Sequence, residues 1–87
     1  MPSYKVLIKR SAAKEIGDLP LRDRRRVVSR IRSLGSRPRP HGCEKLSGQD
    51  RYRIRQGDLR ILYEIDDREQ LVMVVKIGHR RDVYRGQ

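Results

Sequence analysis

The stretch RYRIRQGDLRILYEI, residues 51–65, decides the fold, because apolar and charged side chains alternate along it with a period of two. Tyr52 and Ile54 fall on one face of the first half, and Arg53 and Arg55 fall on the other. A Gln-Gly-Asp turn separates the two halves. The pattern therefore predicts two antiparallel strands joined in a hairpin, with one face directed toward a core.

Two further strands are predicted outside this hairpin. Residues 71–77, LVMVVKI, are the most apolar run of the chain and predict a central strand that ends at Gly78. Residues 4–9, YKVLIK, alternate in the same way and predict an N-terminal strand. Three strands in succession at the C-terminal end predict a meander.

Two helices are expected between the first strand and the hairpin. Ser11 is a suitable N-cap for a short helix with apolar residues at helical spacing, namely Ala12, Ala13, Ile16 and Leu19. Pro20 either ends this helix or begins the next. Residues 21–34 predict a longer helix with Gly35 at the position after its end, and its apolar stripe comprises Val27, Val28, Ile31 and Leu34.

The remaining segment, residues 36–50, predicts a long loop. Two prolines and a glycine within residues 36–42 exclude regular structure there, and residues 43–50 are expected to continue the loop. The order strand, helix, helix and three-strand meander predicts an α+β fold, in which an antiparallel-rich sheet carries two helices packed on one face. No internal repeat is present, so residues 1–87 are expected to form one domain.

The composition points to a polyanionic partner. Lys and Arg number 22 against 11 Asp and Glu, which gives a net charge of +11 on 87 residues, and most of the cations are arginine. Arginine presents a planar fork of donors that suits phosphate, so nucleic acid is expected ahead of a membrane surface. An arginine-biased proteome is the alternative explanation.

Cysteine usage and hydropathy bear on the compartment. The single cysteine, Cys43, excludes an intrachain disulfide and a multi-cysteine metal site, which fits a reducing cytoplasm. No apolar run approaches the roughly 18 residues of a membrane span. The N-terminus, MPSYKVLIKR, is too short and too charged for a signal peptide. A cytoplasmic protein is therefore expected.

Basic side chains are expected to gather on the outer face of the hairpin. If Tyr52 and Ile54 point into the core, then Arg53, Arg55 and Arg60 point outward together. Same-sign charges opposite one another are unfavourable in a sheet, so their presence favours a use for the positive field.

The end of the last strand is expected to join this basic face. It carries His79, Arg80 and Arg81, and antiparallel pairing brings it toward the hairpin. Tyr84 follows in a basic tail without periodicity, where it either takes part in chemistry or covers the edge of the sheet. An arginine cluster with a tyrosine suits metal-free cleavage of RNA, in which the 2′-OH is the nucleophile and the cations stabilise phosphorane charge. A Cys43–histidine pair and a pairing of His41 with His79 remain alternatives.

Five runs carry a resemblance to a known family: SAAKE at 11–15, KLSG at 45–48, YRIR at 52–55, GDLRILY at 57–63 and IGHRRDVYR at 77–85. Together they resemble the RelE family of toxins from toxin–antitoxin pairs. RelE-type members cleave mRNA in the ribosomal A site, using the 2′-OH and no metal. The resemblance therefore implies a ribosome-dependent endoribonuclease that needs no cofactor.

The resemblance also implies site residues. Arg53 and Arg55 match the paired basic positions, Arg60 the arginine that stabilises transition-state charge, Arg80 the arginine near the leaving group and Tyr84 the general base. His79 could share the acid–base work. Further RNA contacts are expected from Lys45, Arg51, Arg81 and Arg85. In the family the paired basic positions are often lysine, and arginine cannot lose its proton to act as acid or base.

The same resemblance implies partners beyond the ribosome and mRNA. An acidic RelB-like antitoxin is expected, with the arginine face of the longer helix and an exposed sheet edge as docking surfaces. Two other functions remain open, a ParE-like poison of DNA gyrase and a non-catalytic nucleic-acid-binding relative. The combination of four arginines with a terminal tyrosine favours the ribonuclease.

Overall fold

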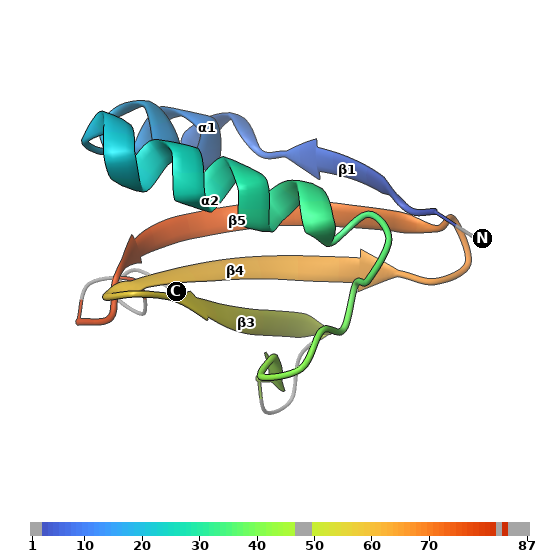
Figure 1. The fold of residues 1–87 in the computed structure, drawn as a ribbon. Coiled ribbons are helices and arrows are strands. Elements are labelled where there is room, and N and C mark those ends of the chain that lie inside the picture. The colour runs from blue at the N-terminus through green and yellow to red at the C-terminus, as the bar shows by residue number, and fades with distance from the viewer. Residues whose placement is uncertain (1–2, 47–49, 82, 84–87) are drawn as a thin grey trace.

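The computed structural model describes residues 3–46, 50–81 and 83. Its elements are β1 (Lys5–Ile8), α1 (Arg10–Gly17), α2 (Leu21–Ser33), β2 (Glu44–Lys45), β3 (Arg51–Gln56), β4 (Leu59–Asp66) and β5 (Leu71–His79). One sheet has the order β1-β5-β4-β3-β2, in which β1 runs parallel to β5 and the other pairs are antiparallel. Both helices lie over one face of this sheet (Figure 1). The predicted α+β fold is confirmed.

The main core lies between the helices and the sheet. Val27 and Ile31 of α2 and Ala12 of α1 are buried against the apolar residues of β3, β4 and β5. Burying each large aliphatic side chain contributes about 1.5–3 kcal/mol, so this layer supplies most of the stability. The opposite face of the sheet has no helix over it in the described part of the chain, and we call it the open face.

The first helix begins earlier than predicted. Its N-cap is Lys9, no side chain caps it, and Ser11 lies inside the helix, so the assignment of Ser11 as N-cap is wrong. The N–H of Lys9 donates to the carbonyl of Val74 at 2.8 Å, which holds Lys9 to the sheet. The chain therefore turns into the helix directly after this bond. Pro20 is the N-cap of α2.

Gly35 follows the last residues of α2, as predicted, but a contact with the N-terminal segment gives it a separate role. Its carbonyl accepts a hydrogen bond from the N–H of Tyr4 at 2.7 Å. A Cβ at this position would lie 3.1 Å from the Tyr4 carbonyl oxygen, which is tighter than nine in ten Cβ contacts in proteins. Glycine therefore lets the end of α2 approach the start of β1.

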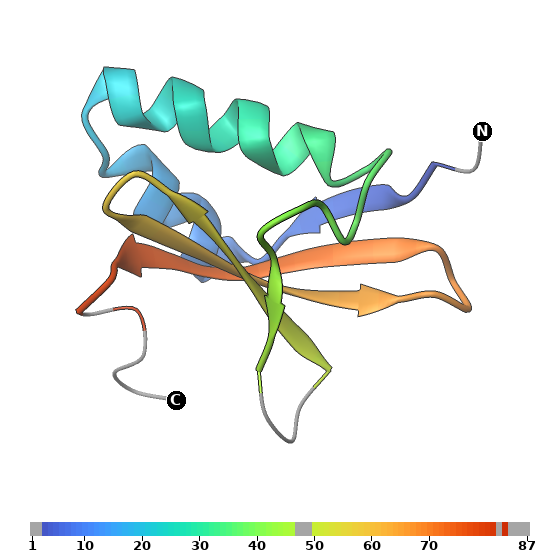
Figure 2. The same cartoon turned by 60° about the horizontal axis from the view of Figure 1, so that its bottom comes forward.

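The predicted loop over residues 43–50 contains a short strand, so that part of the prediction is wrong. Glu44 and Lys45 form β2, which pairs with Arg53 and Tyr52 of β3 at the edge of the sheet (Figure 2). A two-residue strand has no recognisable period, and it forms because the neighbouring edge of β3 offers backbone groups to pair with.

A β-bulge changes the phase of β5. Leu62 pairs with Lys76 and Tyr63 pairs with Val74, so Val75 has no partner on β4. The extra residue reverses which positions of β5 face the helices. Val74 before the bulge and Ile77 after it are consequently both buried in the core.

Glu15 of α1 supports β5 beyond the bulge. Pairing between β1 and β5 ends at Ile8, and the N–H of Ile77 instead donates to the Glu15 carboxylate at 2.9 Å. A carboxylate acceptor satisfies a partly buried amide that would otherwise lack a partner. The SAAKE run thus has a structural role through its last residue.

No helix formed by the described residues is long and apolar enough to cross a bilayer.

Candidate functional site

The open face carries a row of arginines along β3. Arg51, Arg53 and Arg55 alternate with Tyr52 and Ile54, which are buried in the core. Side chains two residues apart on a strand are about 6.6–6.8 Å apart and point to the same side. The predicted gathering of basic residues on the outer face of the hairpin is therefore present.

Arg60 completes this arrangement at the hairpin end. It lies directly opposite Arg55 in the β3–β4 register. One of its terminal nitrogens donates to the carbonyl oxygens of Gly57 at 3.0 Å and Leu59 at 2.9 Å. These bonds anchor the guanidinium on the hairpin turn, while the backbone pairing keeps Arg60 and Arg55 neighbours across the two strands. Like charges directly opposite one another destabilise a sheet, so the Arg55–Arg60 pair lowers the stability of the fold.

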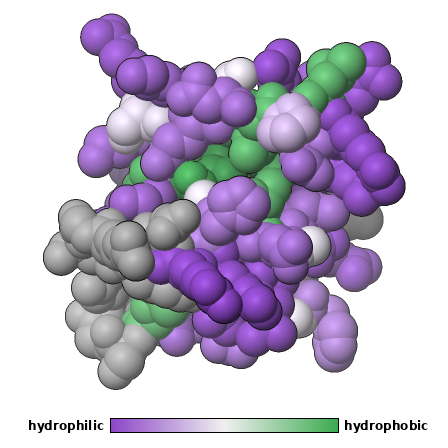
Figure 3. All heavy atoms as spheres, turned by 90° about the vertical axis from the view of Figure 1, so that its left-hand side faces the viewer, coloured by the Kyte–Doolittle hydropathy of each residue, from purple (hydrophilic) through white to green (hydrophobic). Residues whose placement is uncertain are grey.

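The end of β5 returns to the same place. Gly78 lies opposite Arg60, and the N–H of Arg80 donates to the carbonyl of Asp58 in the hairpin turn at 3.0 Å. The predicted approach of this end to the hairpin is confirmed. Figure 3 views the molecule from this end, where hydrophilic side chains dominate the visible surface.

Val83 fixes the segment that follows β5. Its N–H donates to the carbonyl of His79 at 2.9 Å, and its side chain is fully buried. A Cβ on Gly78 would lie 3.7 Å from the Val83 backbone and side chain, so Val83 packs over the glycine on the open face. Val83 and Leu62 are both buried outside the main core cluster. The chain is thereby turned back toward Arg60.

His79 is placed differently from the arginines. It lies opposite Leu59, a core residue, and is therefore out of phase with Gly78 and Arg60. The bulge at Val75 causes this placement, because without it the parity of Val72 and Val74 would direct His79 to the open face. The structure thus brings Arg55, Arg60 and the Arg80 backbone together and leaves the exposed His79 on the other side.

Other predicted site residues lie apart from this cluster or outside the described chain. Lys45 and Arg51 lie at the opposite end of β3 from Arg55, and Arg81 is exposed beyond β5. Tyr84 and Arg85 lie outside the described residues, so their predicted positions are not tested.

Two arginines of the row are paired with carboxylates. Arg53 forms an ion pair with Glu44 at 2.5 Å and its side chain is 16% exposed. Arg51 forms one with Glu64 at 3.2 Å. Neither carboxylate was recognised in the sequence, because the pairing depends on the register of β2 and β4 with β3.

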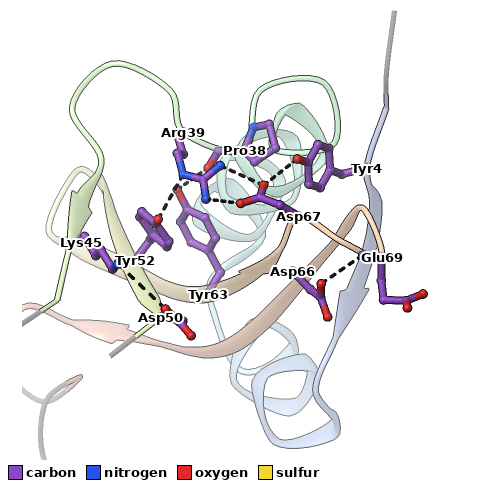
Figure 4. A network of polar contacts seen from close by, with 10 residues as sticks. All are labelled: Tyr4, Pro38, Arg39, Lys45, Asp50, Tyr52, Tyr63, Asp66, Asp67 and Glu69. Carbon is purple, nitrogen blue, oxygen red and sulfur yellow. Dashed lines mark hydrogen bonds and ion pairs between the residues drawn. The ribbon is translucent and has the colours of Figure 1, made fainter. Parts of the chain in front are cut away.

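The far end of the sheet holds a polar network that we call the Arg39 clasp, formed by Tyr4, Arg39, Tyr52 and Asp67 (Figure 4). Arg39 donates to both carboxylate oxygens of Asp67, at 3.1 and 2.8 Å, and to the Tyr52 hydroxyl at 3.1 Å. Its guanidinium also lies 5.1 Å from the centre of the Tyr52 ring. Tyr4 donates to Asp67 at 2.6 Å. The clasp joins the long loop to β3, to the turn that follows β4 and to the segment that precedes β1.

The clasp shifts the protonation of its members. Hydrogen bonds from Arg39 and then from Tyr4 lower the pKa of Asp67 to about 2. The hydrogen bond to Asp67 raises the pKa of the Tyr4 hydroxyl. Burial raises the pKa of the neighbouring Tyr63, whose hydroxyl donates to the Pro38 carbonyl at 2.8 Å. Asp67 therefore stays ionised and both tyrosines stay neutral near neutral pH, so their hydrogen bonds stabilise the fold.

Two open hollows lie on the surface, one at the clasp end and one between α2 and the end of β3. One of about 910 Å³ is bordered by clasp residues together with Lys45 and Arg68. The other, of about 500 Å³, lies beside α2 and is lined by Arg25, Arg26, Ser29, Arg30, Ser33 and Gln56. Within the described ranges, no group of three or more His, Cys, Asp or Glu side chains is placed to hold a metal ion.

Comparison with known proteins places this architecture in a family. The family model described as the ParE toxin of the type II toxin–antitoxin system parDE matches residues 6–84. The chain belongs to the RelE/ParE superfamily of toxins. The predicted resemblance is thereby confirmed.

Solved structures of RelE toxins from other organisms have the same fold as this chain. The RelE–RelB complex from Pyrococcus horikoshii OT3 matches with a TM-score of 0.83 and 28% identity, covering 93% of this chain and 99% of that one. The RelBE2 complex from Mycobacterium tuberculosis gives 0.81 and 28%, covering 94% and 97%. The intact RelBE complex of E. coli gives 0.77 and 25%, covering 88% and 96%.

A curated relative matches over a shorter stretch. Toxin RelG of Mycobacterium tuberculosis is 41% identical over 34 residues, which is 39% of this RelE-type toxin and 39% of RelG. The alignment thus spans well under half of that relative's length.

Proposed function

We propose that this RelE-type toxin is an endoribonuclease that cleaves mRNA in the A site of the translating ribosome and so inhibits translation. The observation that carries the proposal is the pairing of Arg55 with Arg60 at the exposed end of the β3–β4 hairpin, where the Arg80 backbone is attached. Two arginines on the same face and opposite one another across a hairpin suit a phosphate that gains negative charge during reaction. Action on translating ribosomes places the protein in the cytoplasm.

The reaction needs no group beyond RNA and the protein. The 2′-oxygen attacks the adjacent phosphorus, the P–O5′ bond breaks, and the products carry a 2′,3′-cyclic phosphate and a 5′-hydroxyl. Arg55 and Arg60 stabilise the charge on the non-bridging oxygens, and Arg80 stabilises the leaving 5′-oxygen. Arginine stays protonated, so these residues do not transfer the protons.

We assign removal of the 2′-OH proton to Tyr84, which follows the anchored Val83. A phenol among several cations is easier to ionise, which suits a general base. Solvent or His79 then protonates the 5′-oxygen. His79 lies out of phase with Arg60, so this role requires the histidine to reach around the end of the sheet.

RNA approaches along the row of β3 arginines in this proposal. Arg51 and Arg53 extend the positive track away from the reacting phosphate, and Lys45, Arg81 and Arg85 add contacts at its margins. Phosphate contacts of this kind supply affinity and register, and they make binding depend on salt.

An antitoxin partner is part of the same proposal. The structures from Pyrococcus, Mycobacterium and E. coli named above are toxin–antitoxin complexes. We propose that an acidic RelB-like antitoxin binds this chain, with the arginine face of α2 and the free edge of β1 as its docking surfaces. Co-expression with the gene beside it, followed by co-purification, tests this pairing.

A ParE-like action on DNA gyrase is the second candidate, because the matching family model is that of the ParE toxin. The two candidates make different lesions. We expect primer extension on mRNA from cells expressing the chain to show cuts in register with codons. Intact mRNA together with induction of the DNA-damage response would favour gyrase, and intact mRNA without such induction would favour a non-catalytic binder.

A further inference from the structure

Arg53 occupies the centre of the open face. Glu44 of β2 lies opposite it on one side and Leu62 of β4 on the other. Its side chain is 16% exposed, whereas that of Glu44 is 60% exposed. The carboxylate therefore stands on the solvent side of a guanidinium that is otherwise largely covered.

The backbone determines which residue of β2 meets Arg53. Lys45 lies opposite the core residue Tyr52, so Glu44 must project to the open face. A hydrogen bond from the N–H of Leu46 to the Arg51 carbonyl, at 2.8 Å, closes the pairing at its far end. The Arg39 clasp holds the loop that leads into β2. The backbone pairing of β2 with β3 therefore places Glu44 beside Arg53.

A carboxylate and a phosphate compete for the same atoms of arginine. Both present two oxygens to the guanidinium fork, and each forms charge-assisted hydrogen bonds with it. An RNA phosphate that binds Arg53 must therefore displace the Glu44 carboxylate or lie against its charge. Arg55 differs, since the structure gives it no ion pair within the described residues.

We propose that Glu44 is an internal competitor for the RNA backbone at Arg53, which limits the affinity of the open face for RNA. RNA as the ligand rests on the function proposed above. Glu44 keeps Arg53 ordered without substrate and yields its place to one phosphate. Removing the carboxylate then gives RNA one more phosphate contact.

The probe is a short single-stranded RNA with 2′-O-methyl riboses, which this chemistry cannot cleave. Its dissociation constant is measured with the full chain at a series of KCl concentrations. For Glu44→Gln we expect binding about fivefold tighter, since a partly exposed ion pair is worth about that factor. We also expect the slope of log K against log salt to steepen by about 0.7, the value for one more phosphate on a single strand.

Glu69→Gln is the matched control. It removes the same charge from the exposed turn between β4 and β5, away from Arg53. We expect its affinity and salt slope to match those of the unsubstituted chain. Any effect of net charge alone would appear equally in both variants.

A double-mutant cycle assigns the effect to the pair. In an Arg53→Ala background, Glu44→Gln is expected to leave affinity and slope unchanged, because the competed cation is gone. Glu44→Ala is expected to reproduce Glu44→Gln, which guards against an effect specific to glutamine. Equal behaviour of Glu44→Gln and Glu69→Gln, or weaker RNA binding by Glu44→Gln, would overturn the proposal.

This outcome is independent of cleavage. If the protein binds RNA without cutting it, the ribonuclease proposal fails while tighter binding by Glu44→Gln still supports the competitor. If the protein cuts mRNA but Glu44→Gln binds as Glu69→Gln does, the competitor role alone is lost.

Discussion

The two ends of the sheet use arginine in opposite ways. At the clasp end, Arg39 binds Asp67 and Tyr52, so its charge is neutralised inside the structure. At the hairpin end, Arg55 faces Arg60, a second cation. The first arrangement stabilises the fold, and the second costs stability unless an anion binds there. The comparison separates arginines that stabilise the fold from arginines that are placed to bind an anion.

The largest effect is expected from Arg60→Ala. Loss of a preorganised charge at the reacting phosphate should reduce mRNA cleavage on purified ribosomes by about 10²–10³-fold. Stability in urea should change little, because the bonds that the described residues give this guanidinium go to the carbonyls of Gly57 and Leu59 within the same hairpin. Arg68→Ala, which removes an exposed cation at the clasp end, serves as the charge-matched control. Equal losses in both variants would show that net charge alone matters.

Arg39→Ala should have the converse effect. The ion pair and the hydrogen bond to Tyr52 are partly exposed, so we expect a loss of about 1–2 kcal/mol in the free energy of unfolding. Cleavage by the folded fraction should fall far less than for Arg60→Ala. Urea denaturation measures the first quantity, and unchanged stability would show that the clasp is not structural.

Glu15→Ala sharpens the comparison at a third place. The substitution leaves the N–H of Ile77 without its acceptor, which should cost about 1–2 kcal/mol in the free energy of unfolding. The matched control is Lys14→Ala, which changes the exposed residue directly before Glu15 in the same helix. A thermal melt that shifts equally for both variants would contradict the role of the carboxylate.

The smallest effect is a pH dependence of the clasp. The pKa of Asp67 is lowered to about 2 in the folded chain from 3.8 otherwise, so its contribution is present above pH 3.8 and is lost as pH falls toward 2. The difference in stability between the natural chain and Asp67→Asn should therefore shrink over this interval. A constant difference across it would contradict the assignment.

The sequence predicted the strands and helices in which apolar side chains recur at a regular spacing. Alternation over residues 51–65 predicted the hairpin and the side that carries Arg53, Arg55 and Arg60, and the structure shows both. The apolar residues at helical spacing likewise predicted the helix α2. Local patterns of this kind persist because a strand or helix buries one face.

Features that depend on distant contacts were missed. Ser11 failed as an N-cap because the sheet bond of Lys9 sets the start of α1. The bulge at Val75 changed the side on which His79 lies, and β2 exists only through its pairing with β3. The partners of Arg39 and Arg53 lie 28 and 9 residues away in the chain, and no local signal connects them.

Arg55→Gln tests most directly whether the hairpin cations serve RNA at the expense of the fold. The variant keeps a polar side chain of similar length and removes one of the two opposed charges. Urea unfolding and single-turnover mRNA cleavage on purified ribosomes are measured on the same preparation. We predict an unfolding free energy that is unchanged or higher, together with a large loss of cleavage. A less stable protein that cleaves mRNA at the normal rate would contradict this account.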